Sequence, residues 1–185
     1  MKLATVKLES ISSYSQSRPH GTPKLDKESP DAHEKRTWRN RLHTNKDGQI
    51  VIPPMALKNC LAEAAQFLGE KIAGKGNATW TKHFLAGVLV LDAPLLGIAA
   101  EDAEEEWLFL DSNGKKNSGT RVWRCYPLIR EWQCTAEYHI LDETITESAF
   151  LHHLTEAGKF IGIGRFRPRN GGFYGRFKVN GIRWD

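Results

Sequence analysis

The most regular pattern of apolar positions lies in PMALKNCLAEAAQFLG, residues 54–69. Its large apolar residues recur at the spacing of one helix face: Leu57, Leu61, Ala64 and Leu68. A proline at the first helical position and a glycine just after the last one are typical helix boundaries. We therefore expect a helix here whose apolar stripe faces the core.

A second helical stripe follows TITE, residues 144–147. In a capping box, a threonine side chain accepts a hydrogen bond from one backbone N–H, and a glutamate three positions later accepts from another. This pattern predicts a helix that starts at Thr144. Its inward stripe is Phe150, Leu154, Ala157 and Ile161.

Extended structure is favoured in several segments rich in apolar and β-branched residues: 3–11, 49–53, 86–98, 106–110, 120–129, 131–141 and 173–180. In the segment 131–141, apolar residues alternate onto one face, as they do in a half-buried strand. These residues are Trp132, Cys134, Ala136 and Tyr138.

The main elements follow the order strand, helix, strand, strand, helix, strand. This order predicts an α+β fold with a ferredoxin-like (RRM-like, split βαβ) core. Right-handed crossovers place both helices on one face of the sheet and leave the other face free. RRM proteins hold single-stranded RNA on such a face.

Two polar insertions interrupt this core. Residues 12–47 are rich in Ser, Pro, His, Lys and Arg, and we expect this basic insertion to be mobile when alone. Residues 99–120 form an acidic and polar insertion that ends in DSNGKKNSG, a polar hairpin tip or disordered loop. The acidic run at 101–106 contains no Lys or Arg, so we expect it to be a solvated surface or a patch that contacts basic parts of a neighbouring subunit.

The composition fits one globular domain over residues 1–185, with 40% hydrophobic residues and a formal net charge of +4. The three cysteines, Cys60, Cys125 and Cys134, form no CxxC pair, so neither a disulfide framework nor a zinc site is indicated. Neither a signal-peptide core nor a run of about 18 apolar residues is present. We expect a cytoplasmic protein with no membrane partner, no metal and no cofactor.

Glycines, arginines and aromatic rings are interleaved in the segment 158–179, which holds the end of the second helix, a glycine-rich loop and the last strand. Glycine allows a close backbone approach, arginine binds phosphate oxygens through paired hydrogen bonds, and aromatic rings stack on bases. A nucleotide-binding P-loop has a different order of residues, and a dinucleotide fingerprint precedes a helix instead of following one. The pattern therefore indicates a polynucleotide ligand, whereas its plain alternative is a glycine-rich turn with Phe173 or Phe177 in the core.

The loop GIGRFRPRNGGFYGRF, after the second helix, resembles the signature loop of the RAMP superfamily of CRISPR-associated proteins. The segment IPPMALKNCLAEAA, residues 52–65, is similar to the opening of the first helix in the RNA-coating backbone subunits of that superfamily, and SISSYSQSR after the first strand is compatible with it. The resemblance implies copies that stack along a guide RNA, together with other effector subunits and target nucleic acid. It also implies a thumb, for which the insertion around Trp38 and the NGKKNSG segment are both candidates.

The residues that we expect to contact RNA come from the first strand's end, the basic insertion, the first helix and the glycine-rich loop. They are Ser15, Gln16, Arg18, Arg36, Trp38, Arg39, Lys58, Arg165, Phe166, Arg167, Arg169, Tyr174 and Arg176.

Catalysis is the main alternative, because the RAMP superfamily also includes a metal-independent endoribonuclease that cuts CRISPR repeats. His20, His33 and His43, with Tyr14 nearby, could move protons. Histidines in a polar loop are more often exposed or phosphate-facing, and neither Asp26 nor Asp31 is singled out as a cleaving residue. We therefore expect a non-catalytic protein, with a stand-alone or virus-borne single-strand-binding mimic of such a subunit as a further alternative.

Overall fold

The computed structural model describes residues 1–112 and 119–185. Its strands are β1 (Lys2–Ser10), β2 (Tyr14–Ser15), β3 (Gln49–Val51), β4 (Val88–Leu89), β5 (Leu95–Ala99), β6 (Glu104–Asp111), β7 (Arg121–Ile129), β8 (Gln133–Ile140) and β9 (Phe177–Trp184). Its α-helices are α1 (Pro30–Thr37), α2 (Pro54–Leu68), α3 (Thr81–Ala86) and α4 (Glu147–Glu156). Short 3₁₀ turns lie at Trp38–Arg41, Ala100–Asp102 and Pro168–Asn170, and a π-helical turn covers Ala157–Ile161.

The central sheet has four antiparallel strands in the order β4, β8, β1, β9. β1 lies in the middle and pairs with β8 on one side and with β9 on the other. Strands from the two ends of the chain are therefore neighbours, and Leu3 and Asp185 exchange backbone hydrogen bonds of 2.9 Å. The prediction of an α+β fold is confirmed.

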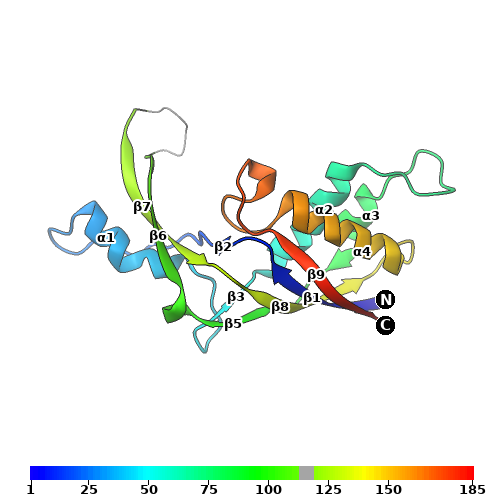
Figure 1. Ribbon diagram of the computed structural model, residues 1–185, viewed down its shortest axis with the longest axis horizontal. Helices are drawn as coiled ribbons and strands as arrows, with labels where there is room; N and C mark the ends of the chain where they lie inside the picture. The colour runs from blue at the N-terminus through cyan, green and yellow to red at the C-terminus, as the bar shows by residue number, and fades with distance from the viewer. Residues whose placement is uncertain (113–118) are drawn as a thin grey trace.

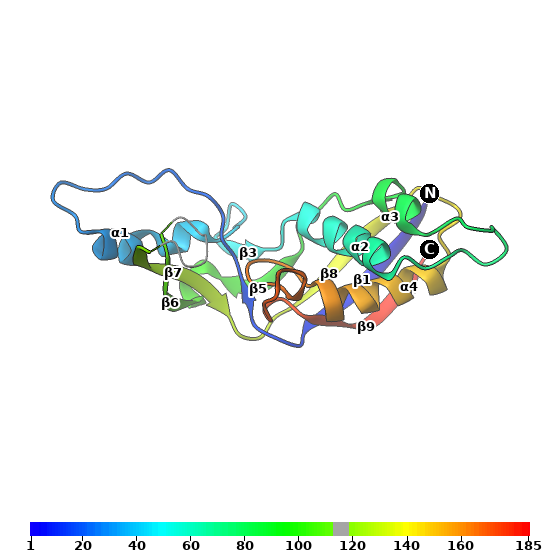
Figure 2. The same cartoon turned by 90° about the horizontal axis from the view of Figure 1, so that it is seen from above.

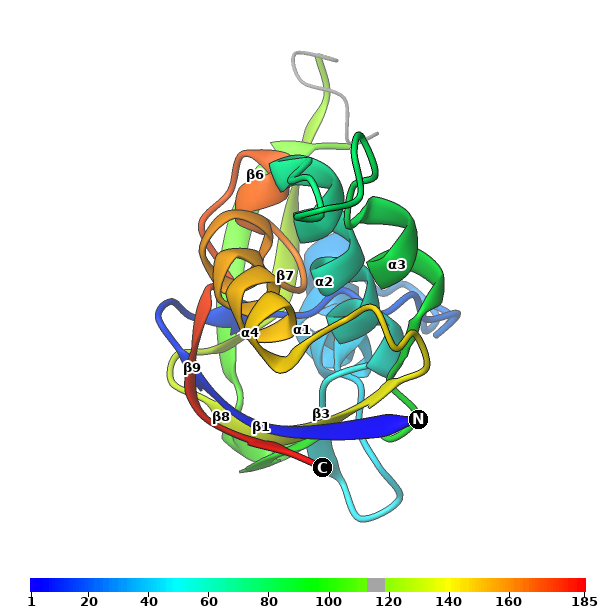
Figure 3. The same ribbon diagram turned by 90° about the vertical axis from the view of Figure 1, so that its right-hand side faces the viewer.

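Helices α2 and α4 cover one face of this sheet (Figure 3). The predicted stripes of both helices face the core, except that Leu68 is only half-buried. Gly69 ends α2 in a left-handed conformation with φ 59°, as its position predicted. The core side chains come from β1 (Ala4, Val6, Leu8), β8 (Cys134, Ala136, Tyr138), α2 (Leu57, Leu61, Ala64) and α4 (Phe150, Leu154).

The two insertions fold together into a second lobe, which extends from the sheet at the left of Figure 1. It consists of α1, the 3₁₀ turn at Trp38–Arg41 and the three-stranded sheet β2–β7–β6, and we call it the hairpin lobe. The basic insertion packs on β7, the strand that follows the acidic insertion. Most of the NGKKNSG segment lies outside the described residues.

Glu34 ties the basic insertion to β7. This α1 carboxylate is 3% exposed and accepts hydrogen bonds from Arg124 (2.7 Å), Arg41 (3.0 Å) and the backbone N–H of Cys125 (3.1 Å). Burial alone would raise the pKa of Glu34, but the backbone N–H and the two guanidinium groups outweigh burial and lower it. Glu34 thus fixes α1 to β7 as a buried ion cluster.

The start of α4 differs from the prediction. The helix begins at Glu147, and the Oγ1 atom of Thr146 caps it by accepting from the backbone N–H of Ala149 at 3.2 Å. The backbone N–H of Thr144 instead donates to Asp142 at 2.8 Å, in the turn before the helix. The predicted capping box at Thr144 is therefore wrong, because the second threonine of the pair takes the capping role.

All three cysteines are free and buried. Burial raises the pKa of Cys125 and of Cys134 to about 12, so both thiols stay protonated at neutral pH. Among the described residues, no helix is long and apolar enough to cross a membrane.

Candidate nucleic-acid interface

Three adjoining cavities lie between the extended segment after β2, the start of α2 and the glycine-rich loop. The first cavity is lined by Arg18, His20, Arg39 and Asn40, and it shares Arg18 and Pro19 with the second. The second shares Ala56 and Gly164 with the third, which continues along α2 past Asn59. We call these three cavities the basic groove, since Glu63 is the only acid among the described residues that line them.

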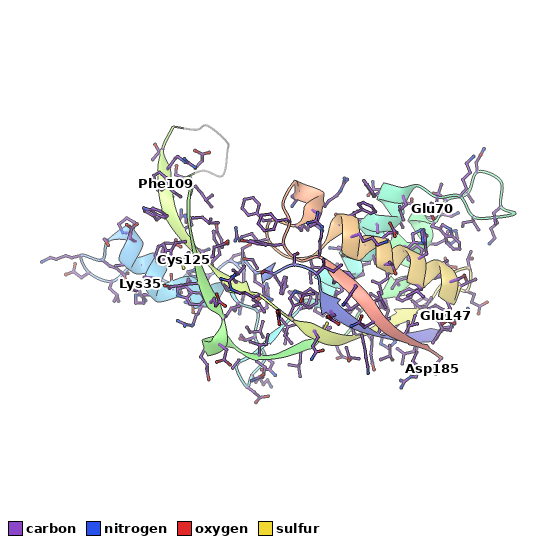
Figure 4. The ribbon with its side chains drawn as sticks, in the orientation of Figure 1. Lys35, Glu70, Phe109, Cys125, Glu147 and Asp185 are labelled. Atoms are coloured by element: carbon purple, nitrogen blue, oxygen red, sulfur yellow. The ribbon has the colours of Figure 1, made fainter. Side chains whose placement is uncertain are left out.

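The extended segment and the hairpin lobe lie on the side of the groove opposite the core helices. Figure 2 shows this segment, in blue, running from the core to the tip of the hairpin lobe beside α1. In Figure 4, Lys35 and Cys125 mark the hairpin lobe, whereas Glu70 and Glu147 mark the far end of the core. The groove therefore lies where the two halves of the molecule meet.

The middle cavity, of about 180 Å³, lies against the N-terminus of α2. Pro53 precedes this 15-residue helix and supplies no side-chain cap, and the first turn contains no acidic residue. Pro53 and Pro54 carry no N–H, and the N–H of Ala56 donates to the carbonyl of Pro53 at 2.9 Å, so the partial positive charge of this end comes mainly from the helix dipole. An anion such as a phosphate would complement it.

Arg165 lies in the wall of the same cavity. Its side chain is only 9% exposed; one Nη atom donates to Glu106 and Nε donates to the Oγ of Ser15 at 3.1 Å. Its guanidinium also stacks on the ring of Tyr126, 4.1 Å from the centroid. The Nη1 atom is buried and has no hydrogen-bond partner within the described structure.

His43 and Arg18 complete the lining of this cavity. Burial lowers the pKa of His43, and the positive charge of Arg18 lowers it further. Arg18 is exposed and forms no ion pair in the part of the chain that the structure describes. The His43 ring is thus neutral near pH 7, close to the unpaired cation of Arg18. A bound anion would favour the protonated ring instead.

Further along α2, two loop arginines meet Glu63. Arg167 donates to Glu63 at 2.9 Å, and the Nε of Arg169 lies 4.0 Å from the other carboxylate oxygen. The guanidinium of Arg169 also lies 6.0 Å from the ring centroid of Phe67. Two of the three loop arginines that we expected to grip phosphates, Arg165 and Arg167, are therefore hydrogen-bonded to carboxylates of the same chain.

The glycines of the loop allow it to approach the segment after β1. A Cβ on Gly164, at φ +78°, would lie 2.4 Å from the carbonyl oxygen of Ser15, and one on Gly175 would lie 1.9 Å from that of Ile163. The backbone N–H of Arg165 donates to Ser15 and that of Gly175 to Ser13. These two amides bind the protein's own carbonyls and are therefore not free to bind a phosphate.

Three of the predicted RNA contacts are buried. Ser15 donates to the carbonyl of Pro127, and Gln16 bonds Tyr14, Val51 and the backbone N–H of His43. Trp38 is 3% exposed and belongs to the core cluster. Because these side chains are enclosed and their hydrogen bonds are used internally, the structure corrects their assignment to the interface.

The remaining predicted residues differ in how accessible they are. Arg39 stacks over Trp38 (4.2 Å) and is exposed in the groove, and Phe166 is 47% exposed. Tyr174 donates to Glu106, and burial together with this carboxylate raises the pKa of Tyr174 to about 12. Arg36 forms an ion pair with Glu28, and Lys58 is half-buried on α2. Arg176 donates hydrogen bonds to the carbonyls of Lys159 and Phe173.

Two histidines of the basic insertion, His20 and His33, lie side by side with ring centroids 6.4 Å apart. His20 bonds the hydroxyl of Thr22 at 3.1 Å, and His33 bonds the carbonyl of the same residue at 2.9 Å. His43 faces the neighbouring cavity instead. No group of three or more His, Cys, Asp or Glu side chains could hold a metal ion in the described ranges 1–112 and 119–185.

Sequence reasoning missed Glu63 and Glu106. Glu63 could have been found, because it lies two helical turns after the start of α2 on the polar face. Glu106 belongs to the acidic run, which we expected to be solvated, yet β6 places it against Arg165 and Tyr174. Nothing local in the sequence indicates that contact.

The fold is similar to those of chains in solved structures. One similar chain is from the cryo-EM structure of the Type III-B Cmr-beta bound to cognate target RNA, with a TM-score of 0.53 and 12% identity over 99% of this chain and 60% of that chain. Another is Cmr6 from Pyrococcus furiosus, with a TM-score of 0.49 and 14% identity over 96% of this chain and 98% of that chain. This protein thus spans about 60% of the length of the Cmr-beta chain.

No protein-family model matches the sequence, and no curated protein is significantly similar to it. At the level of the fold, the predicted resemblance is confirmed by the likeness to a chain of the Type III-B Cmr-beta structure.

Proposed function

We propose that this protein is an RNA-binding backbone subunit of a CRISPR effector-type ribonucleoprotein. The observation that carries the proposal is the basic groove, in which Arg18, His43 and Arg165 meet the uncapped start of α2. A likeness in fold to a Cmr-beta chain, whose structure contains target RNA, supports the same class of ligand. The core would be a ferredoxin-like, split βαβ unit, with which the strand order β4, β8, β1, β9 agrees.

In this proposal the strand's sugar–phosphate chain follows the groove. One phosphate sits at the N-terminus of α2, where the helix dipole and the guanidinium groups of Arg18 and Arg165 supply positive charge. The preceding nucleotide lies beside Arg39, and the following one lies beside Arg167. Because these contacts reach phosphates and not base edges, binding would tolerate many sequences.

Copies of the chain would stack along the guide RNA, in a cytoplasmic complex with other effector subunits. The hairpin lobe supports this part of the proposal, because it extends away from the core, and Glu105 on its strand β6 is exposed together with Glu101 and Asp102 in the turn before that strand. Such a surface could meet a basic surface of a neighbouring subunit. The protein would bind without cutting, and labelled RNA should stay intact during incubation in EDTA.

The test is binding of a labelled single-stranded RNA at several salt concentrations. Each neutralised phosphate releases counterions, so affinity should fall steeply with salt. Arg18→Ala should weaken binding and reduce the slope of log K against log salt by about one. Lys7→Ala is the matched control, since Lys7 is exposed on β1 of the uncovered sheet face. If Lys7→Ala weakened binding and Arg18→Ala did not, the RNA would lie on the sheet face, and the groove assignment would be wrong.

A further inference from the structure

Two phenylalanines are paired on the surface at the end of α2. Phe67 is 52% exposed and Phe160 is 48% exposed, and their ring centroids lie 5.7 Å apart at an interplanar angle of 33°. Phe67 is in the last turn of α2, and Phe160 is in the π-helical turn that follows α4. An aromatic pair that leaves about half of each ring in water contributes little to the core. Its exposure indicates a surface that binds a ligand or another molecule.

The π-helical turn determines where Phe160 points. The backbone N–H of Gly162 donates to the carbonyl of Ala157 at 2.9 Å, five residues back, while Ile161 is fully buried. The wider turn anchors Ile161 in the core and leaves Phe160 outside, beside Phe67. Single π-helical turns of this kind are frequent at functional sites.

The pair continues the line of the basic groove. Phe67 lies four residues after Glu63, so both are on one face of α2, with one helical turn between them. Arg169 joins them: its Nε is 4.0 Å from Glu63, and its guanidinium is 6.0 Å from the ring centroid of Phe67. A strand that leaves the groove past Arg167 therefore reaches Arg169 and then the two rings.

We propose that Phe67 and Phe160 form a stacking platform for unpaired bases of the bound strand, with Arg169 contacting the adjacent phosphate. This inference rests on the proposed function and adds where bases, and not only phosphates, are held. Stacking on an aromatic face is available to every base, so the platform is sequence-tolerant. It requires an unpaired strand, because the faces of bases inside a duplex are already stacked on one another.

The experiment compares two strands of equal length and charge, one of single-stranded uridines and one in which all bases are replaced by abasic sites. Wild-type protein should bind the uridine strand roughly 5-fold to 150-fold more tightly, which is the range for one stacked base. Phe67→Leu/Phe160→Leu should lose this difference and bind both strands as the wild type binds the abasic one. Phe67→Tyr/Phe160→Tyr keeps two stacking rings and should keep the difference.

Leu141→Ala is the matched control, because Leu141 is 46% exposed just after β8, outside the groove lining. Equal binding of the two strands by the wild type would overturn the platform while leaving the proposed function intact. Binding of neither strand would overturn both. A platform variant that kept the difference in affinity but sedimented as a smaller assembly than the wild type would show that the rings join copies of the chain, which also overturns the inference.

Discussion

Arg165 of the glycine-rich loop donates to Glu106 of β6, a residue 59 positions earlier in the chain. The other oxygen of this carboxylate accepts from the hydroxyl of Tyr174. One acid thereby joins the hairpin lobe to both sides of the loop. It also fixes the guanidinium in the wall of the groove cavity, where the buried Nη1 atom still lacks a partner among the described atoms.

Glu106→Gln should therefore destabilise the protein. The amide keeps the shape but removes the charge opposite the largely buried Arg165, and breaking a buried ion pair in this way costs about 3 kcal/mol. Urea unfolding followed by circular dichroism measures the change. Glu105→Gln is the matched control, because its side chain is exposed, and it should lie within about 0.5 kcal/mol of wild type. Equal stability of the two variants would show that the Glu106 contact is energetically unimportant.

Glu63→Gln should increase the affinity of the protein for RNA. It removes the acid from the groove lining and frees Arg167 and Arg169 for phosphate, so RNA affinity at low salt should rise several-fold. Fluorescence anisotropy with a labelled single strand measures this. Glu147→Gln removes the same charge at the far end of the core and should leave affinity nearly unchanged (Figure 4). A weaker Glu63→Gln complex would mean that the carboxylate positions the arginines productively.

RNA binding should strengthen as the pH falls from 7.5 to 6. In the free protein, burial and Arg18 lower the pKa of His43, so the ring is neutral near pH 7. A phosphate in the cavity stabilises the charged ring and raises that pKa, so binding takes up a proton. His43→Gln should bind with a flatter pH profile. His33→Gln, in the same insertion, should keep the wild-type profile, and a pH response unchanged in His43→Gln would assign the proton elsewhere.

The hairpin lobe should lose stability in acid. The pKa of Glu34 is lowered from 4.5 in the folded protein, so the unfolded chain takes up a proton at this residue at a higher pH than the folded protein does. Its stabilisation is complete above about pH 4.5 and is lost as the pH falls through the lowered value. Glu34→Gln should be less stable than wild type at pH 7, and the difference between the two should shrink at pH 3. A difference that is constant with pH would exclude the ion cluster as its origin.

The parts of the fold that follow from local periodicity could be predicted from the sequence. α2 required only the spacing from Leu57 to Ala64 and its two boundary residues, and β8 required only the alternation from Trp132 to Tyr138. The folded state of the basic insertion could not be predicted, because it depends on the contact between Glu34 and Arg124, which are 90 positions apart.

The sequence predicted which segments line the candidate site, but not which of their side chains are free to bind a ligand. Arg18, Arg39 and the glycine-rich loop were expected at the interface and do line the groove or its edge. Which arginines are neutralised depends on Glu63 and Glu106, which belong to other elements. Residue type and spacing identify a cation, whereas its availability depends on tertiary contacts with acids that are distant in sequence.

The pairing of β1 with β9 has a consequence for the order of assembly during translation. The central strand cannot acquire its second neighbour until residues 177–184 have left the ribosome, and the loop that closes the groove is held by hydrogen bonds to Ser13 and Ser15, near the start of the chain. Contacts between such distant segments form late. A nascent chain would therefore emerge without a finished groove, so the RNA binding that we propose would require synthesis to have passed β9.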